Sequence, residues 1–175
     1  MEAFRKNSIN YGLYLGLFLI LATTIIYAID LSLFTTMWVG CINLVIITAF
    51  GILATVKSKK LGGGFLTFRA AFTSFFITVL IGLLISIVYT MLLFNYIDPE
   101  AKAIMTENVI KVTVEMMRKL GAKAADINKI VSDMQKTDSF GTFAQLQGLA
   151  FNLVIYSIIG LICAAVIKRE RPQSL

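Results

Sequence analysis

Four long uncharged runs of apolar residues dominate the hydropathy pattern of this sequence. They cover residues 7–29, 31–56, 70–97 and 139–167, and short charged segments separate them. Each run is longer than the roughly 20 residues that a helix needs to cross about 30 Å of hydrocarbon. The pattern therefore predicts an all-α integral membrane protein, a single domain over residues 1–175, with transmembrane helices at about residues 9–29, 36–56, 70–95 and 149–167.

The segment between the third and fourth runs, residues 98–138, follows a different pattern. Asp98 and Pro99 are the residue types of an N-cap and a first helical position, and Gly121 is placed to end that helix. A second amphipathic helix is predicted at about residues 124–136. The insert is thus expected to be an amphipathic helical hairpin.

Apolar residues recur every three or four positions along the first helix of the hairpin and give it one apolar face. This face consists of Ala101 and the candidate interaction residues Met105, Val109, Val112, Met116 and Leu120. Such a face can pack on the second helix, on the membrane surface or on a partner, and the pattern leaves these choices open.

A basic segment with three consecutive glycines, KSKKLGGGFLTFR from Lys57 to Arg69, separates the second and third runs. The glycines predict the end of the second helix, and Thr67 is the expected N-cap of a helix that begins at Phe68. A phosphate-binding loop needs GxxxxGK followed by Ser or Thr, a pattern that this segment lacks. We therefore interpret the segment as a turn at the membrane surface.

The distribution of lysine and arginine predicts the orientation of the chain. The two terminal segments and the glycine turn contain nine cations and share their side of the membrane with only two acids, Glu2 and Glu170. The cations are Arg5, Lys6, Lys57, Lys59, Lys60, Arg69, Lys168, Arg169 and Arg171. Short basic loops remain in the cytoplasm, so both termini are expected inside and the hairpin is expected to be extracytoplasmic.

The composition excludes a soluble domain, since 58% of the residues are hydrophobic and 15% are charged, against roughly 25% charged in soluble proteins. The formal charge of +6 is accounted for by the cations at the membrane boundaries. Because no basic face with interleaved aromatic residues is present in the sequence, no nucleic-acid partner is expected.

Two pairs of small residues predict where helices approach one another closely. Gly12 and Gly16 form a GxxxG spacing in the first run, and Gly160 and Ala164 form a similar spacing in the fourth. Either pair can seat its helix within the bundle of one chain. The alternative for Gly12 and Gly16 is a contact between two copies of the chain.

The sequence offers no set of residues for catalysis or metal binding. It has no histidine, and Cys41 and Cys163 are expected near opposite faces of the membrane, which excludes a disulfide or a shared metal. Asn43 is interpreted as an interhelical hydrogen-bond donor, with a substrate contact as the alternative. We predict no enzyme activity, no cofactor, and no catalytic, cofactor-binding or metal-binding residue.

Three stretches resemble a known family: GGGFLTFRAAF after the lysine cluster, Tyr89 with NYIDPE after the third span, and IIGLICAAVIKRERP near the end. Through them the chain is similar to the bacterial family called domain of unknown function 4199. The resemblance implies a four-span inner-membrane protein with a helical insert before the last span. It implies no activity and no site residue.

These observations lead to two functional expectations. The first is an interaction or structural membrane protein that presents the extracytoplasmic hairpin, with the lipid bilayer and a membrane protein or a second copy as partners. The second is a subunit of an oligomeric transporter or channel for a neutral solute, because carriers of ions usually retain charged residues within their spans, and these spans have none.

Overall fold

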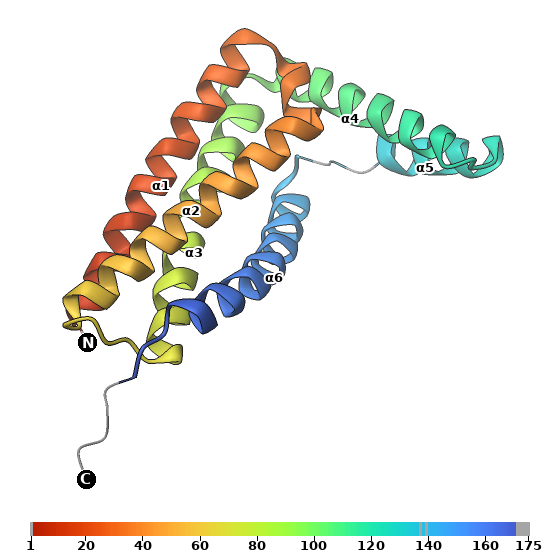
Figure 1. Ribbon diagram of the computed structural model, residues 1–175. Coiled ribbons are helices and arrows are strands. Elements are labelled where there is room, and N and C mark those ends of the chain that lie inside the picture. The colour runs from red at the N-terminus through yellow and green to blue at the C-terminus, as the bar shows by residue number, and fades with distance from the viewer. Residues whose placement is uncertain (1, 137, 139, 171–175) are drawn as a thin grey trace.

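The computed structural model describes residues 2–136, 138 and 140–170, and these residues form six α-helices (Figure 1). The four long helices are α1 (Glu2–Ile29), α2 (Met37–Leu61), α3 (Phe68–Leu92) and α6 (Thr142–Ile167), and the hairpin consists of α4 (Pro99–Lys119) and α5 (Ala124–Lys136). A 3-10 turn, η1 (Leu31–Thr35), precedes α2, and a π turn, η2 (Leu93–Ile97), continues α3. The all-α fold predicted from the sequence is confirmed.

Four segments are long and apolar enough to span a membrane: Ala3–Ile29, Met37–Leu61, Phe68–Ile97 and Thr142–Ile167. They match the predicted spans, except that the second begins one residue later, at Met37, and three of the four extend several residues beyond the prediction at one end. The helix α2 continues through its lysines to Leu61, and α6 already begins at Thr142. Hydropathy reports only the part of a helix that matches hydrocarbon, whereas backbone hydrogen bonding continues into the interface, where lysine side chains reach water.

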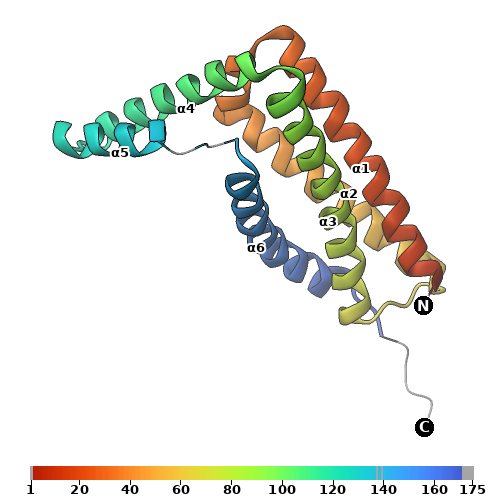
Figure 2. The ribbon, with the colours of Figure 1, turned by 180° about the vertical axis from the view of Figure 1, so that it is seen from behind.

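The helix α3 is the central element of the bundle and packs against α1, α2 and α6. The buried core comprises Leu15 and Leu19 of α1, Ile47 of α2, Phe75 and Val79 of α3, and Tyr156 of α6. Figures 1 and 2 show that the end of α6 lies close to the start of α3 and that α6 diverges from α3 toward the hairpin. The bundle is therefore closed at one end and splayed at the other.

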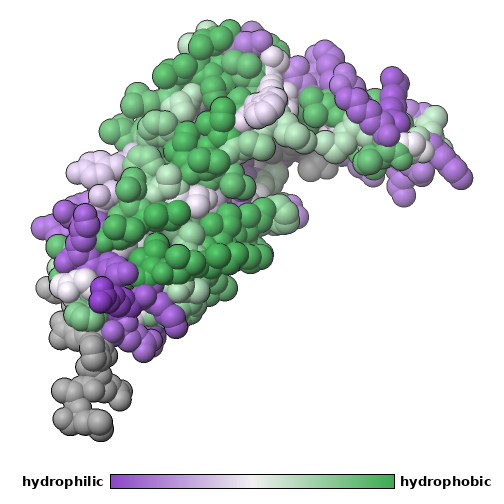
Figure 3. Space-filling view, in the orientation of Figure 1, coloured by the Kyte–Doolittle hydropathy of each residue, from purple (hydrophilic) through white to green (hydrophobic). Residues whose placement is uncertain are grey.

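On the face seen in Figure 3, the surface of the bundle is mainly apolar along its length and hydrophilic toward its ends. Large aliphatic side chains are more than half exposed on every long helix, as shown by Leu17, Val45, Val88 and Ile162. Water does not favour such a surface, but a lipid bilayer does. With the four apolar helices, this surface identifies a multi-pass membrane protein.

The glycine turn closes the end of the bundle that contains Arg5, Lys57, Lys60, Arg69 and Lys168, called the basic end below. The helix α2 ends at Leu61 with Gly62 as its C-cap, and Gly63 and Gly64 have φ angles of +67° and +87°, which glycine adopts without steric cost. Thr67 accepts a hydrogen bond from the backbone N–H of Ala70 and caps α3. The predicted end of the second helix at the glycines and the predicted N-cap at Thr67 are both confirmed. Arg171, the last of the nine cations counted in the sequence, lies outside the residues that the structure describes.

Backbone hydrogen bonds attach the glycine turn to the end of α6. The N–H of Leu66 donates to the carbonyl of Arg169 at 2.8 Å, and the N–H of Arg169 donates to the carbonyl of Leu66 at 2.9 Å. The Nζ of Lys59 donates to the carbonyl of Ile167 at 2.7 Å. These bonds hold α2, α3 and α6 together at the basic end.

Candidate functional site

The hairpin of α4 and α5, called the arm below, leaves the bundle across its long axis and extends beyond its side (Figures 1 and 2). Its first residues are held by Asp98, whose carboxylate accepts hydrogen bonds from the backbone N–H of Ala101 at 3.0 Å and from the hydroxyl of Tyr27 on α1. These two donors stabilise the charged form of the carboxylate and lower the pKa of Asp98 below its ordinary value, with the tyrosine hydroxyl as the larger cause.

Aromatic side chains surround the base of the arm and form an anchor with it. The buried members of this anchor are Leu93, Phe94, Ala101 and Met105, and the rings of Tyr27, Phe34 and Phe140 pack around them. Met105, a predicted interaction residue, is only 4% exposed. It therefore belongs to the anchor and is not available to a partner.

The remaining predicted interaction residues become more exposed along α4. Val109 is half-buried, whereas Val112, Met116 and Leu120 are 38%, 50% and 80% exposed. The last three residues, called the distal stripe below, occur every fourth position and so share one side of the helix. The apolar face predicted from the sequence thus divides into an anchored half and an open half.

A polar contact connects the base of the arm to the start of α6. The Nζ of Lys102 lies 2.6 Å from a carboxylate oxygen of Asp138 and 3.0 Å from Oδ1 of Asn95. Asn95 in turn donates from Nδ2 to the carbonyl of Phe140 at 3.2 Å. The hydrogen bond from Lys102 is the main cause that lowers the pKa of Asp138. The arm and α6 are therefore mechanically connected.

A groove of about 460 Å³ lies between α2, α3 and α6. Its polar lining consists of amides and hydroxyls: Asn43 of α2, Ser86 and Thr90 of α3, and Gln145, Asn152 and Tyr156 of α6. We call it the polar groove. Uncharged donors and acceptors at membrane depth are suited to a neutral polar molecule, because they can replace some of its hydrogen bonds to water.

Two polar groups of this groove use only local hydrogen bonds. Asn152 donates to the carbonyl of Gly148, and Thr90 donates to the carbonyl of Ser86, each within its own helix. Asn43 lines the groove and forms no side-chain hydrogen bond within the part of the chain that the structure describes. The arrangement therefore favours the groove contact over the interhelical bond expected of Asn43.

A buried hydroxyl network that the sequence analysis did not identify joins α1, α2 and α3 near the basic end. The Oγ of Ser74 lies 2.9 Å from those of Ser8 and Ser58, while Asn7 donates to Ser58 at 3.0 Å. Thr78 donates to the carbonyl of Ser8 at 3.1 Å. Every polar group here has a partner, so we assign the network to helix packing. Ser and Thr near the basic ends of three spans were its only signal in the sequence.

Gly12 and Gly16 seat α1 against α3. A Cβ built on Gly12 would lie 2.7 Å from Cβ of Ile81, and one built on Gly16 would lie 2.7 Å from Cδ1 of Ile85. Such separations are shorter than real Cβ atoms tolerate, so the spacing serves the packing of this chain.

The small residues of α6 also face the bundle. A Cβ on Gly160 would lie 2.7 Å from Cδ1 of Phe75, and Ala164 is fully buried against Leu66 and Ala71. Cys41 and Cys163 are free thiols, and the described residues hold no group of three or more potential metal ligands.

Comparison with known proteins gives one family match. The family model described as "Protein of unknown function (DUF4199)" matches residues 10–169, from α1 to the residue that bridges to the glycine turn. No curated protein and no solved structure matches the chain. The match covers most of the sequence and agrees with the resemblance carried by the glycine turn and the last span. The chain therefore belongs to the DUF4199 family.

Proposed function

We propose that this protein is an interaction protein of the bacterial inner membrane that presents the arm to a partner outside the cytoplasm. In this proposal both termini and the basic end are cytoplasmic, as the excess of lysine and arginine there favours. The partner is a membrane protein with an apolar groove or helix near the outer surface of the inner membrane. The protein acts by binding, and the proposal assigns it no catalytic step.

The observation that carries this proposal is the division of α4 into a fixed half and an open half. Ala101 and Met105 are buried in the anchor, whereas Met116 and Leu120 are half or more exposed. A helix held firmly at one end presents its apolar side chains with little loss of conformational freedom on binding. An apolar stripe at helical spacing is also the usual contact surface of a helix that docks in a groove.

The proposal is tested with a photo-crosslinking amino acid at Leu120 in native membranes. We expect one discrete adduct, which the double variant V112Q/M116Q loses while its abundance and insertion remain unchanged. The matched control is K111Q/E115Q, which changes two exposed residues of the same helix outside the distal stripe and retains the adduct. An adduct that survives V112Q/M116Q, or one that forms equally from a probe at Lys111, contradicts the proposal.

The polar groove supports a second candidate function, a subunit of an oligomeric transporter or channel for a neutral solute. Its amides and hydroxyls lie between α2, α3 and α6, and the groove is open on one side. Packing of a second copy over this side would enclose the groove. The enclosed space would then offer hydrogen bonds but no charge to a passing solute.

Solute flux distinguishes the two candidates. Glycerol entry into proteoliposomes, followed by light scattering, is expected to exceed that of empty liposomes only if the second function holds. The variant N43L/N152L would then lower the flux, whereas N10L, which replaces an exposed asparagine of α1, would leave it unchanged. Absence of protein-dependent flux together with a stripe-dependent adduct favours the interaction function.

A further inference from the structure

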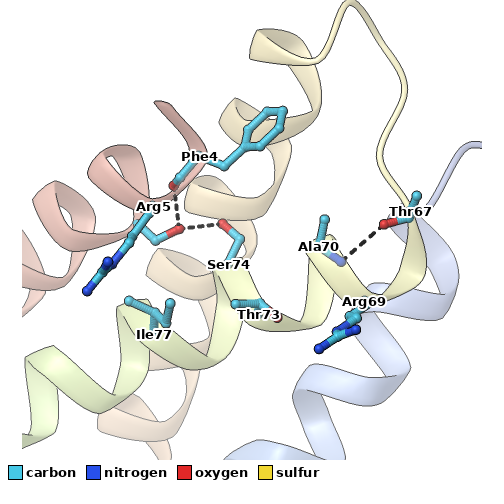
Figure 4. Close-up of a pocket in the computed structure, with 9 residues that line it drawn as sticks. Phe4, Arg5, Thr67, Arg69, Ala70, Thr73, Ser74 and Ile77 are labelled. Carbon is cyan, nitrogen blue, oxygen red and sulfur yellow. Dashed lines mark hydrogen bonds between the residues drawn. The ribbon is translucent and has the colours of Figure 1, made fainter. Parts of the chain in front are cut away.

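A second groove, of about 590 Å³, lies between α1 and α3 at the basic end of the bundle (Figure 4). It is distinct from the polar groove, because its walls come from the start of α1 and the start of α3. Phe4 and Ile77 contribute apolar surface, and Arg5 and Arg69 contribute the charge. Neither proposed function uses this groove.

The two arginines are the free cations of this groove. Both are exposed, and neither has a carboxylate or another hydrogen-bond partner among the residues that the structure describes. Two other cations at the same end have partners, since Lys59 donates to the carbonyl of Ile167 and Arg169 lies over the ring of Phe65. Figure 4 shows the two guanidinium groups at opposite sides of the groove, where no carboxylate of a described residue pairs with either of them. Two unpaired positive charges around one groove favour an anion.

The groove has a fixed floor that leads into the membrane. Arg69, Thr73 and Ile77 are spaced four residues apart, so they follow one line along α3 from its charged start toward its apolar middle. Ser8 and Ser74, whose hydroxyls lie 2.9 Å apart, close the space between the helices beneath this line. The groove therefore joins a charged mouth to an apolar wall.

We propose that this groove binds an anionic phospholipid of the adjacent leaflet. In this proposal the exposed side chains of Arg5 and Arg69 turn toward each other to share the headgroup phosphate, and an acyl chain lies along Ile77. Guanidinium groups can bind phosphate through two parallel hydrogen bonds, and the first N–H groups of α3 add to the positive potential at the mouth. Basic pockets between spans on the cytoplasmic side are suited to anionic lipid headgroups. A free phosphate would use the arginines but not the apolar wall.

The test is native mass spectrometry of the purified full chain, titrated in detergent with phosphatidylglycerol or phosphatidylcholine. We expect one retained phosphatidylglycerol per chain and little retained phosphatidylcholine. R5Q/R69Q is expected to weaken binding about 30-fold, since each arginine near a charged lipid surface contributes about fivefold. The matched control K57Q/K60Q removes the same charge from the same end and leaves binding nearly unchanged.

Two further variants distinguish a loss of lipid binding from misfolding of the chain. R5K/R69K keeps the charge that orients the chain but loses the paired hydrogen bonds, and it is expected to bind more weakly than the wild type. I77W fills the apolar wall with both arginines in place and is also expected to weaken binding. Equal binding of phosphatidylglycerol by R5Q/R69Q and the wild type, equal retention of both lipids, or displacement of the lipid by excess inorganic phosphate would overturn the proposal.

Discussion

The ring of Phe75 on α3 occupies the space that a side chain on Gly160 of α6 would need. A Cβ at Gly160 would lie 2.7 Å from Cδ1 of the ring, and a Cβ at Gly51 on α2 would lie 2.5 Å from Cε2 of the same ring. Phe75 is 1% exposed, so it is enclosed between two glycines on two helices. One aromatic side chain thereby sets the distance of α3 from both α2 and α6.

The first prediction follows from this arrangement. G160A should destabilise the bundle by about 1–3 kcal/mol, because the ring of Phe75 has no free direction in which to move. The measurement is unfolding in detergent with increasing sodium dodecyl sulfate. G148A, on the same helix but with no neighbouring atom within 4 Å of the added Cβ, should leave stability unchanged. Equal midpoints for the two variants would contradict the packing role.

The second prediction concerns the hydroxyl network. S74A removes the shared partner of Ser8 and Ser58 and should cost about 1 kcal/mol, as expected for hydrogen bonds between helices in membranes. S157A is the matched control, since the Ser157 hydroxyl bonds only the carbonyl of Leu153 in its own helix. Unfolding by sodium dodecyl sulfate measures both variants. The assignment fails if S157A is as costly as S74A.

The third prediction is a pH dependence at the base of the arm. The pKa of Asp98 is lowered from its ordinary 3.8, so its carboxylate stabilises the anchored state at all pH values above 3.8. This contribution is lost as the pH falls through the lower pKa of the folded state. Between pH 5 and 8 the contribution of Asp98 to the stability of the anchored state should therefore stay constant.

Removal of the tyrosine hydroxyl tests the cause of this shift. Y27F should raise the pKa of Asp98 toward 3.8, since the hydroxyl of Tyr27 is the main donor that lowers it. The midpoint is read from the carboxyl carbon resonance of Asp98 in micelles. D98N keeps an oxygen that can cap α4 and should preserve the arm while it removes the acid transition. A midpoint unchanged by Y27F would refute the proposed cause.

The fourth prediction concerns orientation. In a background without Cys41 and Cys163, a cysteine at Lys60 should resist a membrane-impermeant thiol reagent in cells with a permeabilised outer envelope and an intact inner membrane. A cysteine at Ser132 on the arm should react, because the proposed topology keeps the basic end in the cytoplasm and the arm outside. Lysis should make the cysteine at Lys60 reactive. Labelling at Lys60 before lysis would reverse the proposed topology.

Local signals in the sequence predicted the ends of several elements closely. Thr67 and Asp98 cap their helices through hydrogen bonds to residues three positions ahead, and Gly121, with a φ of +77°, follows the end of α4. The second helix of the hairpin was predicted at residues 124–136, which are the observed limits of α5. Such features depend only on neighbours in the chain and can therefore be predicted from the sequence.

Features that depend on distant neighbours could not be obtained in this way. The apolar face of α4 was visible in the sequence, but its spacing does not distinguish a residue covered by the bundle, such as Met105, from an exposed one, such as Met116. The pairing of Leu66 with Arg169 and the polar groove beside Asn43 likewise require the approach of helices far apart in the chain. Periodicity shows which residues share a face, whereas only the fold shows what covers it.

The backbone hydrogen bonds between Leu66 and Arg169 restrict α6 to rotation about its end at the basic end of the bundle. That end is fixed to the glycine turn by these bonds and by Lys59, while the opposite end is joined to the arm through Lys102 and Asp138. A force applied to the arm is therefore transmitted to the free end of α6. Since the polar groove lies between that end and α2, we expect its width to change when this end of α6 moves.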